Sequence, residues 1–207
     1  NLFCLESRKA LEMLRRHDSR LGRRLCLTLM FETPETQFLC ASLFDLAIVL
    51  EKALMTPSES LLAAIRIQWW VDVLAAPDKP ATTPLVAQLN KLGQLYPGLD
   101  KQIVKIIERW QDASHQENRD SVDGWRMIWQ ILAQRTGWVD FAADAALIGA
   151  VLRLSGHTAA FDKVHVVANR VHALNRHKVN YRHSWLYLNA VLVCWLSGRD
   201  PADEHPM

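Results

Sequence analysis

The stretch "SESLLAAIRIQWWVDVL" (58–74) decides the fold, with Arg66 at helical spacing among aliphatic residues and two tryptophans soon after it. Pro57 precedes Ser58, and a serine in this position is a typical cap for the first turn of a helix. We therefore predict a helix over 59–75. Neighbouring residues of a helix point about 100° apart. We expect one of the two indoles to pack in the bundle and the other to cover an adjoining helix.

The rest of the chain (residues 1–207) also has the pattern of helices. It has only eight Gly and eight Pro, and no long stretch alternates with period two. Trp125, Ile128, Trp129 and Leu132 repeat at the spacing of one buried helix face. With no internal repeat, the chain is predicted to be a single all-α domain, a bundle with antiparallel neighbours. Expected are helices at 3–16, 36–54, 84–95, 99–117, 121–135 and 139–154, a connector at 17–24, a short helix ended by Pro34, a loop at 75–84, and one or two final helices.

The composition argues against several classes of function. The net charge is only +2, and no basic residues interleave with aromatic ones, so nucleic acid is not an expected partner. The four cysteines lack zinc spacing and are expected to be reduced thiols. The longest apolar run, "WLYLNAVLVCWL" (185–196), is shorter than the roughly 18–20 residues that cross a bilayer, which predicts a buried or interface-docked helix. No Gly-rich phosphate loop, HExxH or GxSxG motif occurs.

The helix of 59–75, the loop after it and "TTPLVAQL" (82–89) together resemble the squalene/phytoene synthase family. Upstream, "HDSRLGRRLCLTLMFETPETQFLCASLFDLA" (17–47) is similar to the family's first segment, and "SGRDPADEHP" (197–206) resembles the tail of its bacterial branch. The branch most similar is a divergent one that includes a mitochondrial complex I assembly factor and its alphaproteobacterial relatives. The resemblance implies an isoprenoid-synthase type of bundle, shortened in its C-terminal half.

The resemblance also implies two Asp-rich motifs on facing helices, whose carboxylates would hold magnesium ions against diphosphates. On 36–54, Asp45 is the only Asp, and Glu51, six positions on, lies on another face of the helix. The second motif aligns near "LIGAVLRLSGHT" (147–158), which has no acidic residue. We therefore expect no metal site and no cofactor. Asp45 is either a remnant ligand or a polar group hydrogen-bonded inside the bundle.

One other acidic pair has DxxxD spacing. Asp140 and Asp144 lie in "WVDFAAD" (138–144), at a predicted helix start, where carboxylates interact favourably with the helix dipole. We therefore interpret the pair as a feature of the helix start and not as a metal site. The alternative is a prenyl diphosphate-condensing transferase with rearranged magnesium ligands, namely Asp45, Asp140 and Asp144.

The span 163–183 has no acidic residue. Val164, Val167, Val171 and Leu174 give it an apolar stripe, so it is predicted to be a basic amphipathic helix. Two interpretations stay open for this helix. It binds an anionic membrane surface or an acidic partner subunit, or it is only a solvated outer face of the bundle. Its basic residues are Lys163, Arg170, Arg176, Lys178 and Arg182.

Two interpretations remain for the helix of 59–75. In a synthase, Arg66 and Gln68 would line the pocket near the diphosphates, with Trp69 and Trp70 on the same remnant pocket helix. In a packed bundle, Arg66 would stack on an indole or pair with an acid. Because the aspartates are missing, we interpret the segment as a retained core helix.

These patterns predict a catalytically inactive synthase-like protein. It would act as a scaffold, accessory subunit or assembly factor, with protein subunits of a membrane-bound complex as partners. The expected location is a mitochondrial respiratory membrane, and the alternative is the periphery of a bacterial membrane. A further hypothesis is an isoprenoid or lipid carrier that keeps a cavity without catalysis.

Overall fold

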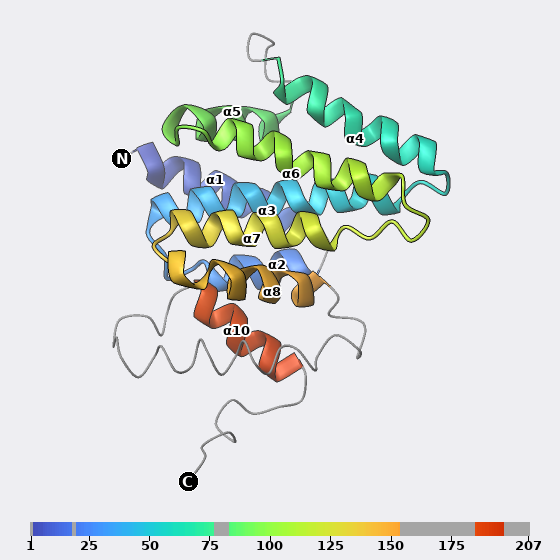
Figure 1. Cartoon of the computed structure of the whole chain (residues 1–207). Helices are drawn as coiled ribbons and strands as arrows, with labels where there is room; N and C mark the ends of the chain where they lie inside the picture. Colours follow the sequence, from blue (N-terminus) through green and yellow to red (C-terminus); the bar gives the residue numbers. More distant parts are fainter. Residues whose placement is uncertain (1, 18–19, 77–82, 154–184, 197–207) are drawn as a thin grey trace.

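The protein is an all-α bundle, as predicted. The computed structural model describes residues 2–17, 20–76, 83–153 and 185–196, which contain helices, turns and loops but no strand (Figure 1). The predicted basic helix of 163–183 lies outside these residues. The elements are α1 (Leu2–Arg16), α2 (Arg20–Thr28), α3 (Pro34–Met55), α4 (Ser60–Leu74), α5 (Pro84–Leu95), α6 (Leu99–Ser114), α7 (Val122–Arg135), the 3-10 turn η1 (Val139–Phe141), α8 (Ala142–Arg153) and α10 (Trp185–Leu196).

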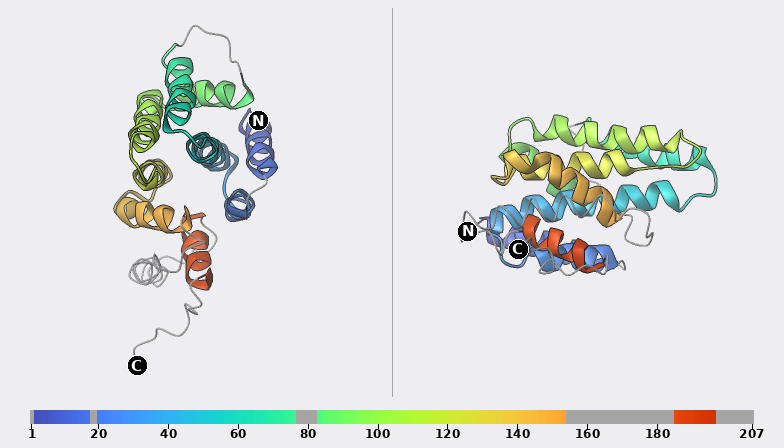
Figure 2. Two further views of the ribbon diagram at one scale, coloured as in Figure 1. Left: turned by 90° about the vertical axis from the view of Figure 1, so that its right-hand side faces the viewer. Right: turned by 60° about the horizontal axis from the view of Figure 1, so that its bottom comes forward.

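Helix α3 is the centre of the bundle, and α1, α2, α4, α5, α6 and α7 all contact it (Figure 2). Its start is encoded locally: Pro34 opens the first turn, and the Thr33 hydroxyl accepts a hydrogen bond from the backbone N–H of Thr36. From Phe38 to Ile48 every residue is buried. Burial of this helix on all sides explains why its sequence has no polar stripe.

Most of the tryptophans belong to the core. The predicted buried face of α7 is confirmed, because Trp125, Ile128, Trp129 and Leu132 are all buried. Trp110 and Trp125 donate their indole N–H groups to Glu51 Oε2, at 3.2 and 3.1 Å. The Ser121 hydroxyl donates to the same oxygen at 2.5 Å. Glu51 therefore joins α3 to α6 and α7 through a partly buried carboxylate whose three donors offset its desolvation.

Helix α10 packs on α2 and α8. Trp185 and Leu186 are buried, as expected for a docked apolar helix. The Asn189 side-chain amide donates to Thr28 Oγ1 at 2.9 Å, and the Trp185 backbone N–H donates to Glu32 Oε1 at 2.7 Å. In the part of the chain that the structure describes, no helix combines the length and the apolar character needed to cross a membrane.

Three local predictions are wrong. Helix α2 already begins at Arg20, inside the predicted connector of 17–24. Its Leu25 side chain is fully buried in the core, which stabilises the helix in this position. Helix α4 begins after Glu59, and Ser58 does not cap it. Instead, the Arg119 guanidinium donates to the Ser58 carbonyl oxygen at 2.8 Å and fixes this turn. The predicted helix of 139–154 is divided into η1 and α8.

Candidate functional site

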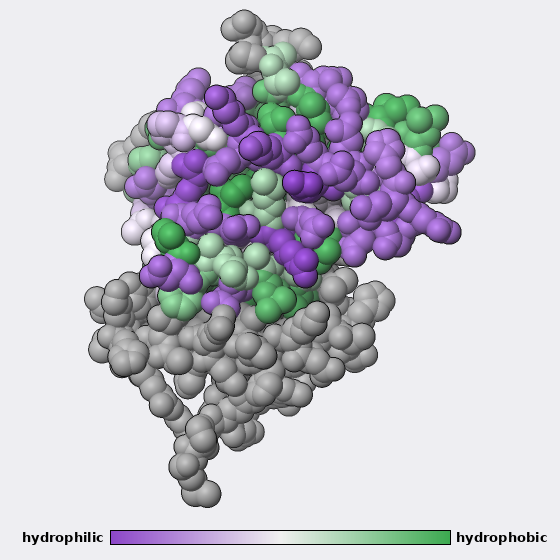
Figure 3. Space-filling view, viewed as in Figure 1, coloured by the Kyte–Doolittle hydropathy of each residue, from purple (hydrophilic) through white to green (hydrophobic). Residues whose placement is uncertain are grey.

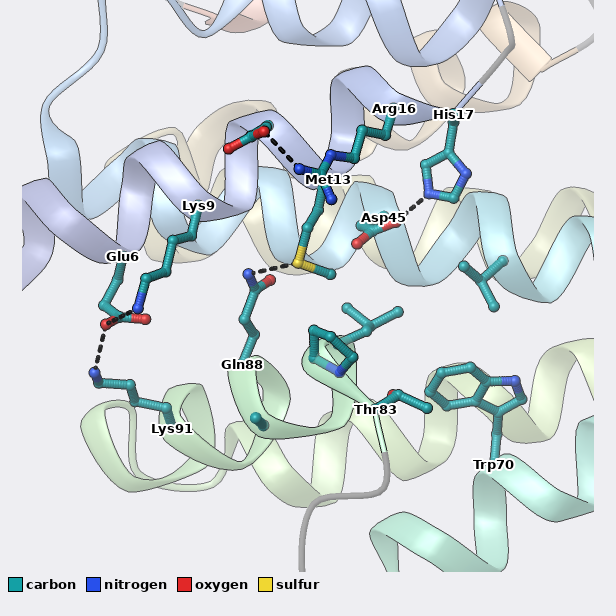
Figure 4. A pocket seen from close by; sticks show the side chains of 15 residues that line it. Glu6, Lys9, Met13, Arg16, His17, Asp45, Trp70, Thr83, Gln88 and Lys91 are labelled. Atoms are coloured by element: carbon teal, nitrogen blue, oxygen red, sulfur yellow. Dashed lines mark hydrogen bonds and ion pairs between the residues drawn. The ribbon is translucent and has the colours of Figure 1, made fainter.

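A cavity lies between α1, α3 and α5, with the C-terminal half of α4 at one end (Figure 4). Its volume is about 800 Å³. One wall is charged, and the other is formed by apolar side chains and a buried amide. The lining includes Glu6, Lys9, Glu12, Met13, Arg16, His17, Asp45, Val49, Trp70, Leu85, Gln88 and Lys91.

At one end of the cavity, Glu6 is shared by two lysines. Lys91 Nζ lies 3.0 Å from Glu6 Oε1, and Lys9 Nζ lies 3.7 Å from the same oxygen. Further along α1, Arg16 is paired with Glu12 at 2.7 Å. Since one carboxylate faces two ammonium groups, the α1–α5 end of the cavity has a local excess of positive charge.

The deepest charged group of the cavity is Asp45, which is 2% exposed. Its Oδ1 is hydrogen-bonded to His17 Nε2 (Figure 4). The Lys52 ammonium lies 3.3 Å from His17 Nδ1, where it donates, so His17 Nε2 carries the proton given to Asp45. Of the two alternatives left open for Asp45, the geometry fits the hydrogen-bonded group inside the bundle.

Sequence reasoning missed His17. It lies just past the end of α1 and 28 positions before Asp45, and no spacing rule connects two helices at that separation. The only available signal is that a buried carboxylate requires a partner. That requirement does not say which residue supplies it.

The apolar wall contains a second group that sequence reasoning missed. Gln88, which is buried, donates from Nε2 to Met13 Sδ at 3.0 Å and accepts from the Ser42 hydroxyl at 3.3 Å. Trp70 closes the other end of this wall. The polar groups of the cavity are therefore occupied by partners within the protein.

The structure separates the four residues predicted on α4. Trp70 is buried and lines the cavity, while Trp69 is exposed and meets the Trp70 ring edge-on at 5.0 Å. Gln68 points to α6, accepting a hydrogen bond from Gln111, and donates to Asp72 at 2.8 Å. Arg66 is exposed and lines a shallow groove beside Trp69. Only Trp70 shares a cavity with Asp45. One indole packs in the bundle, as predicted, while the other, Trp69, stays 40% exposed.

The interpretation of α4 as a core helix is wrong. Only Ala63, Ile67 and Trp70 of this helix are buried. Val71, Val73 and Leu74 are partly buried against the core. Four further large apolar side chains are between 40% and 67% exposed, and they form a stripe at spacings of one, three and four residues along one side of the helix. Figure 3 shows a hydrophobic patch over the N-terminal end of α4. We call this stripe the α4 outer face; it consists of Leu61, Leu62, Ile65 and Trp69.

The position of α4 explains this outcome. The helix packs on α6, α3 and α5, all of which lie on its inner side (Figure 2). A sequence that is apolar on most faces predicts burial all round. Within this chain, the elements described cover only one side.

The three aspartates of the transferase alternative are not brought together. Asp140 is exposed in η1, and Asp144 is buried in the first turn of α8, where the helix dipole favours a carboxylate. Among the described residues, no three His, Cys, Asp or Glu side chains gather in a way that could hold a metal ion. Asp45, Asp140 and Asp144 are all within that described part.

Comparisons of the chain with family models, with curated proteins and with solved structures gave no match.

Proposed function

We propose that this chain is a catalytically inactive, squalene/phytoene synthase-like protein that acts as a scaffold, accessory subunit or assembly factor of a membrane-bound complex. Its partners are protein subunits of that complex. The location that goes with this proposal is the mitochondrial respiratory membrane, with the periphery of a bacterial membrane as the alternative.

The observation that carries the proposal is the α4 outer face. Isolated exposed apolar side chains are common on proteins, but a contiguous stripe of large ones is typical of an interaction surface. A tryptophan beside branched aliphatic residues provides the kind of anchor that dominates the binding energy of protein interfaces. Arg66 borders the stripe, and arginine is also enriched at interfaces.

The state of the cavity supports the inactive part of the proposal. Magnesium–diphosphate chemistry needs several carboxylates free to bind metal. Asp45 is instead engaged by His17, and Glu6 is engaged by Lys9 and Lys91. The carboxylates nearest the cavity are thus used to hold α1 against α3 and α5.

The test is quantitative affinity capture from native membranes with Ile65→Glu and a matched control, Val139→Glu. Both positions are large, apolar and exposed, but Val139 lies in η1, away from α4. The wild type and Val139→Glu should capture a stoichiometric set of membrane-complex subunits, and Ile65→Glu should lose it. A monomer without partners, or equal capture by both variants, would overturn the proposal.

The cavity supports a second candidate, an isoprenoid or lipid carrier. A volume of about 800 Å³ is in the range of small-molecule pockets, and Trp70, Val49 and Leu85 give it an apolar wall. Extraction of the purified protein followed by mass spectrometry tests this candidate. A lipid recovered in stoichiometric amount from the wild type and reduced by Val49→Trp would support a carrier, and an empty protein would exclude it.

A further inference from the structure

A second exposed apolar surface lies on the hairpin of α1 and α2, far along the chain from the α4 outer face. The two helices are joined by a short connection and pack side by side, with the Cys26 thiol donating to the Leu11 carbonyl oxygen at 3.8 Å. Between them runs a groove of about 560 Å³. Leu11 and Cys26 form its floor.

The groove is bordered by protruding apolar side chains. Leu27 and Met30 line it, and Phe31 follows directly in the chain. These three side chains are between 59% and 69% exposed, which includes the most exposed large apolar side chain among the described residues.

Arginines surround the same groove. Arg8 and Arg15 lie seven residues apart on α1, so they share a face, and Arg23 lines the groove from α2. Among the described lining residues, Glu12 is the only acidic one, and its carboxylate is paired with Arg16 at 2.7 Å. Among the described residues, the surface therefore combines exposed apolar side chains with the positive charges of Arg8 and Arg15.

The floor of the groove adds no negative charge. Burial raises the pKa of the Cys26 thiol, and the nearby Arg15 only partly offsets this effect. The thiol thus stays protonated at neutral pH and acts as a small apolar group.

We propose that the α1–α2 surface docks on an anionic phospholipid bilayer, with Leu27 and Met30 entering the head-group region and Arg8 and Arg15 meeting lipid phosphates. The chemistry favours a lipid surface over a protein partner. Basic residues beside exposed apolar side chains match the boundary of an anionic bilayer, where phosphates lie next to acyl chains. The residues lining this groove are arginines, apolar residues and one paired glutamate.

This mode of docking is the one used by interfacial helices. Apolar side chains sink into the boundary between head groups and acyl chains, and basic residues add electrostatic attraction to anionic lipids. No membrane-crossing helix is needed. The proposal does not depend on the α4 outer face, which is on different residues.

The experiment is sedimentation of the purified chain with vesicles of phosphatidylcholine alone and of phosphatidylcholine with about 30% phosphatidylserine. The wild type should bind the anionic vesicles, more weakly as salt is raised. The double variant Arg8→Gln/Arg15→Gln should bind roughly 30-fold more weakly, since each basic residue near the surface contributes about 1 kcal/mol. Leu27→Ser should also weaken binding, even at low salt.

The matched control is Arg109→Gln/Arg126→Gln. These arginines are about half exposed on α6 and α7, and their removal changes the net charge by the same amount. The control should bind as the wild type does. Equal loss in both double variants, or no binding to anionic vesicles, would overturn the proposal. So would a finding that the α1–α2 variants lose only a protein partner.

The same assay keeps this proposal separate from the proposed function. Purified Ile65→Glu contains no partner subunit and retains the α1–α2 surface. It should therefore bind anionic vesicles normally while failing to capture protein subunits.

Discussion

Helices α3 and α4 have similar apolar sequences but very different surroundings. Helix α3 is covered on all sides by other helices, and even its one aspartate, Asp45, is buried with a histidine partner. The described elements cover helix α4 on one side only, and Leu61 and Ile65 are more than half exposed. The same hydrophobic content therefore has two consequences. In α3 it stabilises the fold, and in α4 part of it is left available for a partner.

The largest expected effect compares Phe44 of α3 with Ile65 of α4. Phe44 is fully buried, with its ring 5.2 Å from that of Trp129. Phe44→Ala should lower the free energy of unfolding by about 3–5 kcal/mol, because it removes buried surface and leaves a cavity. Ile65→Ala should change it by less than about 0.5 kcal/mol. Urea denaturation of the isolated chain measures both, and similar losses would contradict the exposed position of Ile65.

The next effect tests the polar side of α3. Glu51→Leu removes the acceptor of the Trp110, Trp125 and Ser121 donors. We expect a loss of about 2–3 kcal/mol, because each buried donor left without an acceptor is costly. Glu108→Leu, at an exposed position of α6, is the control and should be nearly neutral. Thermal unfolding of the two variants side by side distinguishes a structural carboxylate from a dispensable one.

A smaller effect concerns the tight packing of the core beyond α3. A Cβ atom on Gly149 of α8 would lie 2.1 Å from a ring carbon of Trp129, so Gly149→Ala must displace a buried indole. We expect a loss of roughly 1–3 kcal/mol from this overpacking. At Gly93 of α5, the nearest atom would be Asp100 Cβ at 3.3 Å. Because alanine favours a helix, Gly93→Ala should be neutral or slightly stabilising in the same denaturation assay.

The smallest effect is on pH dependence, at the turn before α3. Burial raises the pKa of Glu32, and the N–H of Trp185 partly offsets this. The folded state then holds the carboxyl proton more tightly than the unfolded state, so stability falls as pH rises from the ordinary carboxyl pKa, about 4.3, through the folded value. This decline should lower the free energy of unfolding by less than about 1 kcal/mol at pH 7. Glu32→Gln, which cannot titrate, should not show it. A melting temperature that falls equally with pH in both proteins would contradict it.

Much of the helical pattern was predictable from the sequence. Pro34 and Pro84 each open a helix after a threonine whose hydroxyl caps it, a purely local signal. The repeat of Trp125, Ile128, Trp129 and Leu132 identified the inner face of α7 for the same reason. Such features depend on residues within a turn or two of each other.

The position of α4 was not predictable in this way. Its apolar residues occur on nearly every face, so periodicity gives no inner side, and the neighbours that cover it come from α3, α5 and α6. The contacts of the cavity pose the same problem. His17 and Asp45, or Met13 and Gln88, belong to separate helices, and only the folded bundle brings them together.

The most direct test of a partner on the α4 outer face is site-specific photo-crosslinking in native membranes. A photoreactive side chain at position 65 should give one predominant protein adduct, and the same group at position 139 should give none. Both positions tolerate the substitution because both side chains are exposed. Adducts of equal yield at the two positions, or no adduct at position 65, would contradict the account of α4 as the docking helix.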